Sequence, residues 1–106
     1  MTGKSAKARK ASKPFRAADY LESDADVAAY LRAALEDGDA RVITIALRDA
    51  AEAVGGMAVL ARKAGLSRET LYRTLSPRGN PRLDTLATLL AAFNLRLTVE
   101  PLKRAA

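Results

Sequence analysis

The sequence predicts an all-α domain of five helices followed by a single C-terminal β-strand. Apolar residues recur at three- and four-residue spacing through most of residues 17–94, which is the period of an amphipathic helix. Glycines and short polar side chains, which commonly end or begin helices, separate these stretches. Apolar and polar residues then alternate over residues 95–101, which is the period of a half-buried strand.

The composition of the chain argues against catalysis. Its 106 residues suffice for one compact domain with its own core, and they include neither cysteine nor histidine. The chain therefore lacks a disulfide framework, a thiolate nucleophile, the commonest general base and the best transition-metal ligands. We expect a protein that is not an enzyme and that uses no cofactor and no metal ion.

The sequence predicts neither export nor membrane insertion. Its beginning, "MTGKSAKARKASKPF", is basic but lacks the apolar core of a secretory signal, and its few apolar residues make a poor transit peptide. No later stretch approaches the ~20 apolar residues of a membrane span. We expect a cytoplasmic protein.

Charge is divided unevenly along the chain, whose formal net charge is +6. Residues 1–16 carry six basic side chains and no acid, and we expect a disordered tail that either solubilises the protein or contacts DNA. In the domain formed by residues 17–106, an acidic helical half at 17–56 has nine acids against three arginines. From residue 57 onward, nine basic residues face three acids. This division predicts two surfaces, one suited to a polyanion and one to a basic partner.

The acidic half contains the first two predicted helices. The first is capped by Ser23 or Asp24 and ends at Gly38. The second begins after Asp39 and continues to Gly55. The β-branched residues near its start resemble a strand, but the apolar residues that follow keep helical spacing, so we interpret the whole segment as a helix.

Two short helices joined by a glycine-containing turn are predicted next, a pattern typical of the helix-turn-helix unit. The first lies between Gly56 and Gly65, and the second is capped by Ser67. Gly65 falls where the turn needs a left-handed backbone. Ala61 falls where the two helices cross and where only a small side chain fits.

The second of these helices is the candidate for contact with DNA. Leu66 and Leu71 are expected to point inward and to tie it to the first helix, which leaves the opposite face free. Arg68 has the geometry to donate two hydrogen bonds to guanine, and Glu69 can accept one from cytosine. The outward residues are Ser67, Arg68, Glu69, Tyr72 and Arg73. The same pattern occurs in helical proteins that bind no nucleic acid, but the basic charge of this half favours DNA.

A last helix over residues 83–93 precedes the predicted strand. Asn94 is expected to end it in a left-handed conformation, and Pro101 to end the strand. A lone strand exposes its hydrogen-bonding edge, so we expect it to pair with the same strand of a second copy rather than to lie as a flap on its own helices. The dimerisation residues would be Leu95, Leu97 and Val99.

The order of these motifs resembles a known family. The turn and helix "GLSRETLYRTLS", the run "GNPRLDTL" and the closing "LRLTVEP" are similar to the Xre-type helix-turn-helix of the HigA-like addiction-module antidote family. The upstream "DYLESDADVAAYLRAALEDGD" resembles the N-terminal helical segment of that family, so the resemblance covers about residues 18 to 102. It implies a five-helix, Xre/lambda-repressor-like domain.

The resemblance also implies a function. Such a protein is an antitoxin that neutralises a RelE/ParE-like toxin by direct binding and represses its own operon, as a homodimer, by binding operator DNA. Thr74 departs from the pattern, because an apolar residue is usual there, and we expect Leu75 to supply the anchor instead. The choice among Tyr72, Arg73 and Ser76 as DNA contacts therefore stays open. Carried over by position, the DNA-binding residues are Ser67, Arg68, Glu69, Thr70, Tyr72, Arg73, Arg78 and Asn80.

The acidic half suits a basic toxin. A negatively charged face would be electrostatically complementary to such a partner, although helix capping alone explains some of these acids. The candidate toxin-binding residues are Asp19, Glu22, Asp24, Asp26, Glu36, Asp37 and Asp39.

The sequence is also compatible with two other functions. The main alternative is a stand-alone Xre-type transcriptional regulator without a toxin partner. Another is a protein-interaction module whose helix-turn-helix is only a scaffold, which would bind DNA weakly and lose that binding as salt rises.

Overall fold

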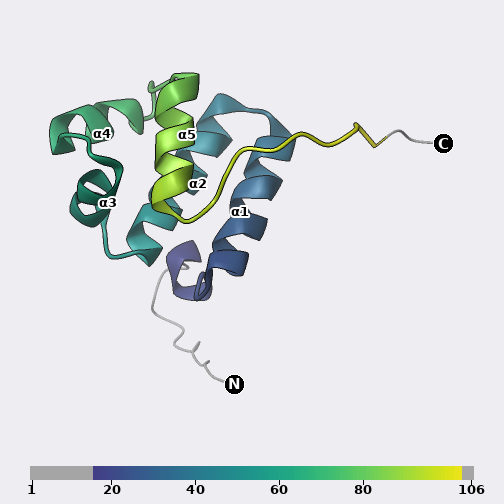
Figure 1. The fold of residues 1–106 in the computed structure, drawn as a ribbon, viewed down its shortest axis with the longest axis horizontal. Helices are drawn as coiled ribbons and strands as arrows, with labels where there is room; N and C mark the ends of the chain where they lie inside the picture. Colours follow the sequence, from purple (N-terminus) through teal and green to yellow (C-terminus); the bar gives the residue numbers. More distant parts are fainter. Residues whose placement is uncertain (1–15, 104–106) are drawn as a thin grey trace.

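The computed structural model describes residues 16–103. All the regular secondary structure of these residues is helical, which confirms the all-α prediction and the number of α-helices (Figure 1). A short 3₁₀ turn, η1, precedes them at Ala17–Tyr20. The α-helices are α1 (Asp24–Asp37), α2 (Ala40–Ala53), α3 (Met57–Ala64), α4 (Arg68–Thr74) and α5 (Leu83–Ala92).

The first two helices begin where polar side chains bond to free backbone amides. Ser23, rather than Asp24, caps α1: its Oγ accepts a hydrogen bond from the amide of Asp26 at 3.1 Å. Asp39 caps α2 by accepting from the amide of Arg41 at 2.8 Å. Such caps typically contribute about 1 kcal/mol each.

Helix α2 is continuous through its β-branched start, as predicted. Thr44 and Leu47 are buried on its inner side, whereas Val42 and Ile45 are partly exposed on its outer side. The inward apolar positions recur with helical rather than strand spacing, and this burial decides the conformation of the segment.

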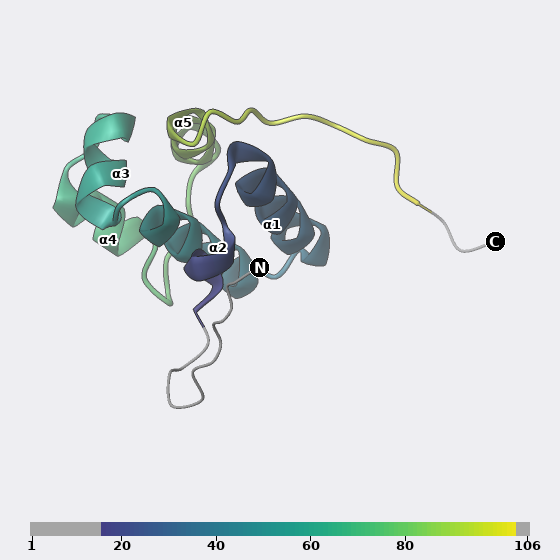
Figure 2. The same cartoon turned by 90° about the horizontal axis from the view of Figure 1, so that it is seen from below.

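The helices pack into one bundle around a common core. Helix α1 lies along α2, and α3 contacts α2, α4 and α5. Figure 2, seen from below, shows α3 and α4 at one side of the bundle and α1 at the other. The buried apolar residues form one cluster: Val27, Leu31, Ala34, Ala46, Leu47, Ala50, Ala51, Leu60, Ala61, Leu71, Leu75, Leu89, Leu90 and Phe93.

Most of the predicted N-terminal tail, residues 1–15, lies outside the described residues. Arg16, the last residue of that prediction, forms an ion pair with Glu52 at the end of α2. Both side chains are more than half exposed, so the pair contributes little stability. It nevertheless draws the start of the described chain toward α2, which also contacts η1.

The chain leaves α5 through a residue with a left-handed backbone. Asn94 has φ 65°, as predicted, and the amide of Leu95 bonds back to the carbonyl oxygen of Leu90 at 2.8 Å. The Asn94 side-chain amide also donates to Asp24 Oδ2 at 3.3 Å, which links this exit to the start of α1. The direction in which the C-terminal segment departs is therefore fixed by backbone and side-chain bonds.

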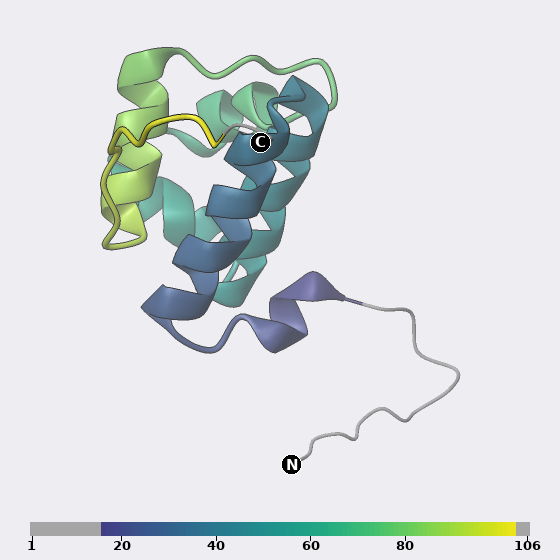
Figure 3. The same cartoon turned by 90° about the vertical axis from the view of Figure 1, so that its right-hand side faces the viewer.

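The strand predicted at residues 95–101 is not confirmed. Within the described part of the chain these residues adopt no regular secondary structure. Figure 1 shows them running past α5 and α1 as a stretched segment, and Figure 3, in which this segment points toward the viewer, shows its start beside α5. A strand needs a second strand to accept and donate its backbone hydrogen bonds. Pairing across a dimer therefore stays a prediction.

A half-buried phenol joins the first two helices. The hydroxyl of Tyr30 on α1 donates to Asp49 Oδ2 on α2 at 2.5 Å. Burial, together with the bond to this carboxylate and its negative charge, raises the pKa of Tyr30 from its ordinary value of 10.0 to about 12. The neutral phenol thus stabilises the fold below pH 10, and this contribution is lost as the pH rises through about 12.

We predict that one of the chain's three tyrosines ionises late in an ultraviolet titration of the folded protein. The step with a midpoint near pH 12 should disappear in Tyr30→Phe. In Asp49→Asn, which keeps the burial but removes the charge, the midpoint should fall but stay above 10. A late step that survives in Tyr30→Phe would contradict this assignment.

Candidate nucleic-acid interface

Helices α3 and α4 are joined by a tight turn of three residues, Gly65 to Ser67. Gly65 has φ 70°, in the left-handed region, as predicted. The amides of Gly65 and Leu66 both bond back to carbonyl oxygens near the end of α3, the latter to Ala61 at 2.9 Å. This glycine lets the chain turn at once from one helix to the other.

Helix α4 is held to the core by its inner side. Leu71 and Leu75 are both fully buried, and Leu66 is half-buried against the same cluster. Leu75 therefore supplies the anchor, as expected from the polar residue at Thr74, which is only half-buried. Ala61 of α3 is buried as predicted. The roll of α4 about its axis follows from these contacts.

The predicted DNA-binding residues lie on the outer side of α4 and in the loop after it. Thr70 is half-buried, and the others are exposed. Ser67 and Thr70 are already engaged with one another, because Ser67 Oγ accepts from the Thr70 amide at 3.0 Å and donates to Thr70 Oγ1 at 2.8 Å. Their hydroxyls therefore serve the helix start. The exposed members are Ser67, Arg68, Glu69, Tyr72, Arg73, Arg78 and Asn80.

Of Tyr72, Arg73 and Ser76, the three alternative DNA contacts at the end of α4, two have accessible side chains. Tyr72 is 42% exposed and Arg73 is exposed, so both side chains are accessible. Ser76 is half-buried and its hydroxyl donates to the carbonyl oxygen of Arg73 at 2.9 Å. Tyr72 and Arg73 are thus the accessible pair.

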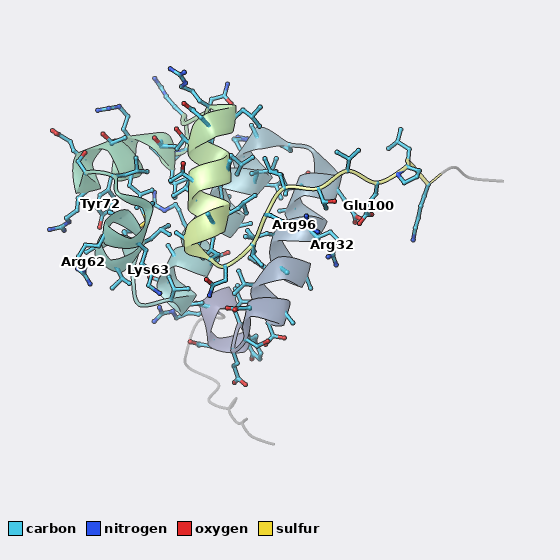
Figure 4. The ribbon with its side chains drawn as sticks, in the orientation of Figure 1. Arg32, Arg62, Lys63, Tyr72, Arg96 and Glu100 are labelled. Atoms are coloured by element: carbon cyan, nitrogen blue, oxygen red, sulfur yellow. The ribbon has the colours of Figure 1, made fainter. Side chains whose placement is uncertain are left out.

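The side of the molecule formed by α3 and α4 is basic, with Arg62, Lys63, Arg68 and Arg73 against one exposed acid, Glu69. Among residues 16–103, neither Arg68 nor Arg73 forms an ion pair. Arg62 and Lys63 at the end of α3 are exposed as well, and Figure 4 shows both on the same side as Tyr72. Unpaired guanidinium groups beside an exposed aromatic ring suit phosphates and base edges.

Arg48 of α2 holds the end of α4 and was not predicted. Its Nη1 donates to the carbonyl oxygen of Leu75 at 3.1 Å, beyond the last turn of α4. A carbonyl at a helix end lacks a partner within the helix, so this bond satisfies it and ties α4 to α2. Sequence gives no signal for it, since the two residues are 27 positions apart.

Gly79 fixes the loop that bears Arg78 and Asn80. A Cβ atom on this glycine would lie 1.9 Å from the carbonyl oxygen of Thr74, too close for any other residue. The amide of Gly79 also bonds to the carbonyl oxygen of Ser76 at 2.8 Å. The loop is therefore pressed against the end of α4. The composition of the loop predicted a turn but not the close approach of Gly79 to Thr74.

The predicted toxin-binding acids are all exposed but do not form one face. One group surrounds the start of α1 and the other surrounds its end, and a helix of this length separates them by about 20 Å. Several also serve the backbone: Asp26 accepts from the amide of Glu22, and Asp37 from the amide of Asp39. The first group is Asp19, Glu22, Asp24 and Asp26, and the second is Glu36, Asp37 and Asp39.

The described residues offer neither a metal site nor a membrane-spanning helix. No group of three or more histidine, cysteine, aspartate or glutamate side chains in residues 16–103 could hold a metal ion. None of the helices in that part of the chain has both the length and the apolar character needed to cross a membrane.

Comparisons with known proteins identify one family for this chain. Residues 11–101 match the family described as "Probable addiction module antidote protein". An uncharacterized protein of Haemophilus influenzae is 39% identical over 88 residues, which cover 83% of this chain and 90% of that protein. No solved structure matches the chain significantly.

We predict that Arg48→Ala lowers the free energy of unfolding by about 1 kcal/mol, because it leaves the carbonyl oxygen of Leu75 without its partner. Urea denaturation measures the change. Arg41→Ala is the matched control, since Arg41 is exposed on the same helix and its side chain makes no bond to another described residue. Equal effects of the two substitutions would show that the bond does not hold α4.

Proposed function

Since the chain belongs to the family of probable addiction module antidote proteins, we propose that it is the antitoxin of a type II toxin-antitoxin module. It neutralises a RelE/ParE-like toxin by direct binding and represses its own operon by sequence-specific binding to operator DNA. Such partners place the protein in the cytoplasm, and we propose that location for it. The role is one of binding and regulation rather than of catalysis.

The exposed face of α4, whose two arginines form no ion pair with a described residue, is the observation that carries the DNA-binding part. In this proposal α3 and α4 form an Xre-type helix-turn-helix unit, and α4 enters the major groove. Arg68 and Glu69 contact base edges, Tyr72 and Arg73 contact bases or the backbone one turn later, and Arg78 lies near a phosphate. Ser67 and Thr70 keep the start of α4 in place, and Asn80 lies beside Arg78 in the loop.

The toxin is proposed to bind the acids at the start of α1. Toxins that act on RNA or on the ribosome tend to be basic, and an acidic surface speeds their association and selects for them. Asp19 and Glu22 are the best candidates, because both are exposed and neither carboxylate caps a helix or accepts a hydrogen bond from a described residue.

Repression is proposed to need a homodimer. Two recognition helices related by a two-fold axis bind half-sites about 34–36 Å apart, which multiplies the specificity of one copy. The C-terminal segment with Leu95, Leu97 and Val99 is the proposed contact between copies, since Leu97 is 40% and Val99 is 92% exposed.

Bacterial growth tests the proposal directly. Expression of the small open reading frame beside this gene should arrest growth, and co-expression of this protein should restore it. The double substitution Asp19→Lys with Glu22→Lys should weaken the rescue, because it reverses the charge offered to the toxin. Arg68→Ala is the matched control and should rescue fully, since it changes the DNA-binding face alone.

Two outcomes would contradict the proposal in different ways. If no neighbouring frame is toxic, or if the protein does not restore growth, the antitoxin function is wrong and a stand-alone regulator remains. If the charge-reversed variant rescues as well as the wild type, the toxin binds elsewhere.

A further inference from the structure

The C-terminal arm, residues 94–103, is fixed at its start by hydrogen bonds. The backbone of the rest of the arm has no hydrogen-bond partner among the described residues. Asn94 and Leu95 are bonded to α1 and α5 as described above. Beyond them, no backbone hydrogen bond joins residues 96–103 to another described residue. Val99 and Leu102 are 92% and 87% exposed. Large apolar side chains on an unpaired, stretched backbone favour pairing with another strand.

A groove runs beside this arm. It has a volume of about 870 Å³ and is lined on one side by α1 and on the other by residues 94–98 and 100. Leu31 and Leu35 form part of its apolar wall on α1, and Leu35 is 38% exposed. Charged side chains of both signs stand around it: Figure 4 shows Arg32, Arg96 and Glu100 close together there. An occupant of this groove needs apolar side chains and charges of both signs.

We propose that the occupant is the same arm of a second copy, paired antiparallel in a register centred on Thr98. This inference rests on the dimer of the proposed function and specifies it. In this register Arg96 of each copy lies opposite the partner's Glu100, Leu97 lies opposite the partner's Val99, and Thr98 faces its own equivalent. Each of these is a favourable cross-strand pair, and the two-fold symmetry makes each charge pair occur twice.

Neighbouring registers lose these pairs. Centring on Leu97 would set Arg96 opposite the partner's Thr98 and Glu100 opposite the partner's Asn94, with no charge pair. Centring on Val99 would set Arg96 opposite the partner's Leu102. In a register centred between two residues, each odd-numbered residue would lie opposite an even-numbered one. Because opposed residues lie on the same face of the ladder, apolar side chains would then lie beside polar ones.

Pro101 fits the same register. It would lie opposite the partner's Leu95, two residues from the Leu97 pairing. Directly opposed residues in an antiparallel ladder alternate between hydrogen-bonded and non-hydrogen-bonded pairs. If the Thr98 pair is hydrogen-bonded, the Pro101 pair is not, so the missing amide hydrogen of proline costs no ladder bond. The odd-numbered residues then form the more closely spaced pairs of the ladder.

Charge reversal tests the register through the dimer dissociation constant, measured by sedimentation equilibrium at low salt. Arg96→Glu and Glu100→Arg should each weaken the dimer about tenfold, because each places like charges opposite one another twice. The double swap, R96E with E100R, should return the constant to within about twofold of the wild type. Lys103→Glu, outside the paired stretch, is the matched control and should change little.

Cysteine pairing gives a second measurement that does not depend on charge. The chain has no cysteine of its own, so Leu97→Cys mixed with Val99→Cys should form a disulfide-linked dimer on mild oxidation. Neither variant alone should do so, because each cysteine then lies diagonal to its equivalent. A disulfide-linked dimer of Leu97→Cys alone would overturn the register in favour of one centred on that residue.

The remaining outcomes separate this inference from the function on which it rests. A dimer that none of the charge variants weakens overturns the register and leaves the proposed dimer standing. A wild type that is monomeric at every concentration overturns both the register and the dimer, but not toxin binding. Charge variants that weaken toxin binding in a monomeric protein would assign the arm to the toxin instead and overturn the inference.

Discussion

The burial of Leu71 and Leu75 is the constraint on which the candidate site depends. Both side chains are fully buried in the shared core, and truncating a buried leucine typically costs about 2–5 kcal/mol. Since a whole domain of this size is stable by only about 5–15 kcal/mol, a rotation of α4 that exposed either leucine would be prohibitive. The core therefore decides that Arg68, Tyr72 and Arg73 face outward. Arg48 and Gly79 add smaller restraints at the end of the same helix.

The bundle concentrates opposite charges in different places. Helices α3 and α4 carry Arg62, Lys63, Arg68 and Arg73 against the single acid Glu69, whereas acids gather around both ends of α1. A protein that must bind a nucleic acid and a basic protein at the same time needs its two charged surfaces apart, because each would otherwise repel or compete for the other's partner. The fold offers that separation, with the C-terminal arm leaving from a third position beside α1.

Local features of the sequence predicted much of this structure. Caps such as Ser67 and left-handed positions such as Gly65 and Asn94 depend only on a residue and its near neighbours in the sequence. A local sequence pattern therefore predicts them. The bond from Arg48 to Leu75 and the contact of Gly79 with Thr74 arise only when the helices and the following loop are packed, and no local pattern encodes them. Acids predicted as one face proved to be two groups, one at each end of α1, although the predicted bounds of that helix already implied their separation. A strand at residues 95–101 would need a partner strand for its backbone hydrogen bonds, so the sequence shows its alternating pattern although the described chain forms no strand there.

The most direct test of the DNA-binding claim is a competition between operator DNA from upstream of the gene and a scrambled duplex of the same composition, at two salt concentrations. We expect the wild type to keep its preference for the operator as salt rises, because base contacts rather than phosphate contacts carry it. Arg68→Ala should lose roughly 1–3 kcal/mol of that preference while binding the scrambled duplex almost as before. A wild type whose preference vanishes as salt rises, or an Arg68→Ala variant with unchanged preference, would contradict the assignment of α4 to the major groove.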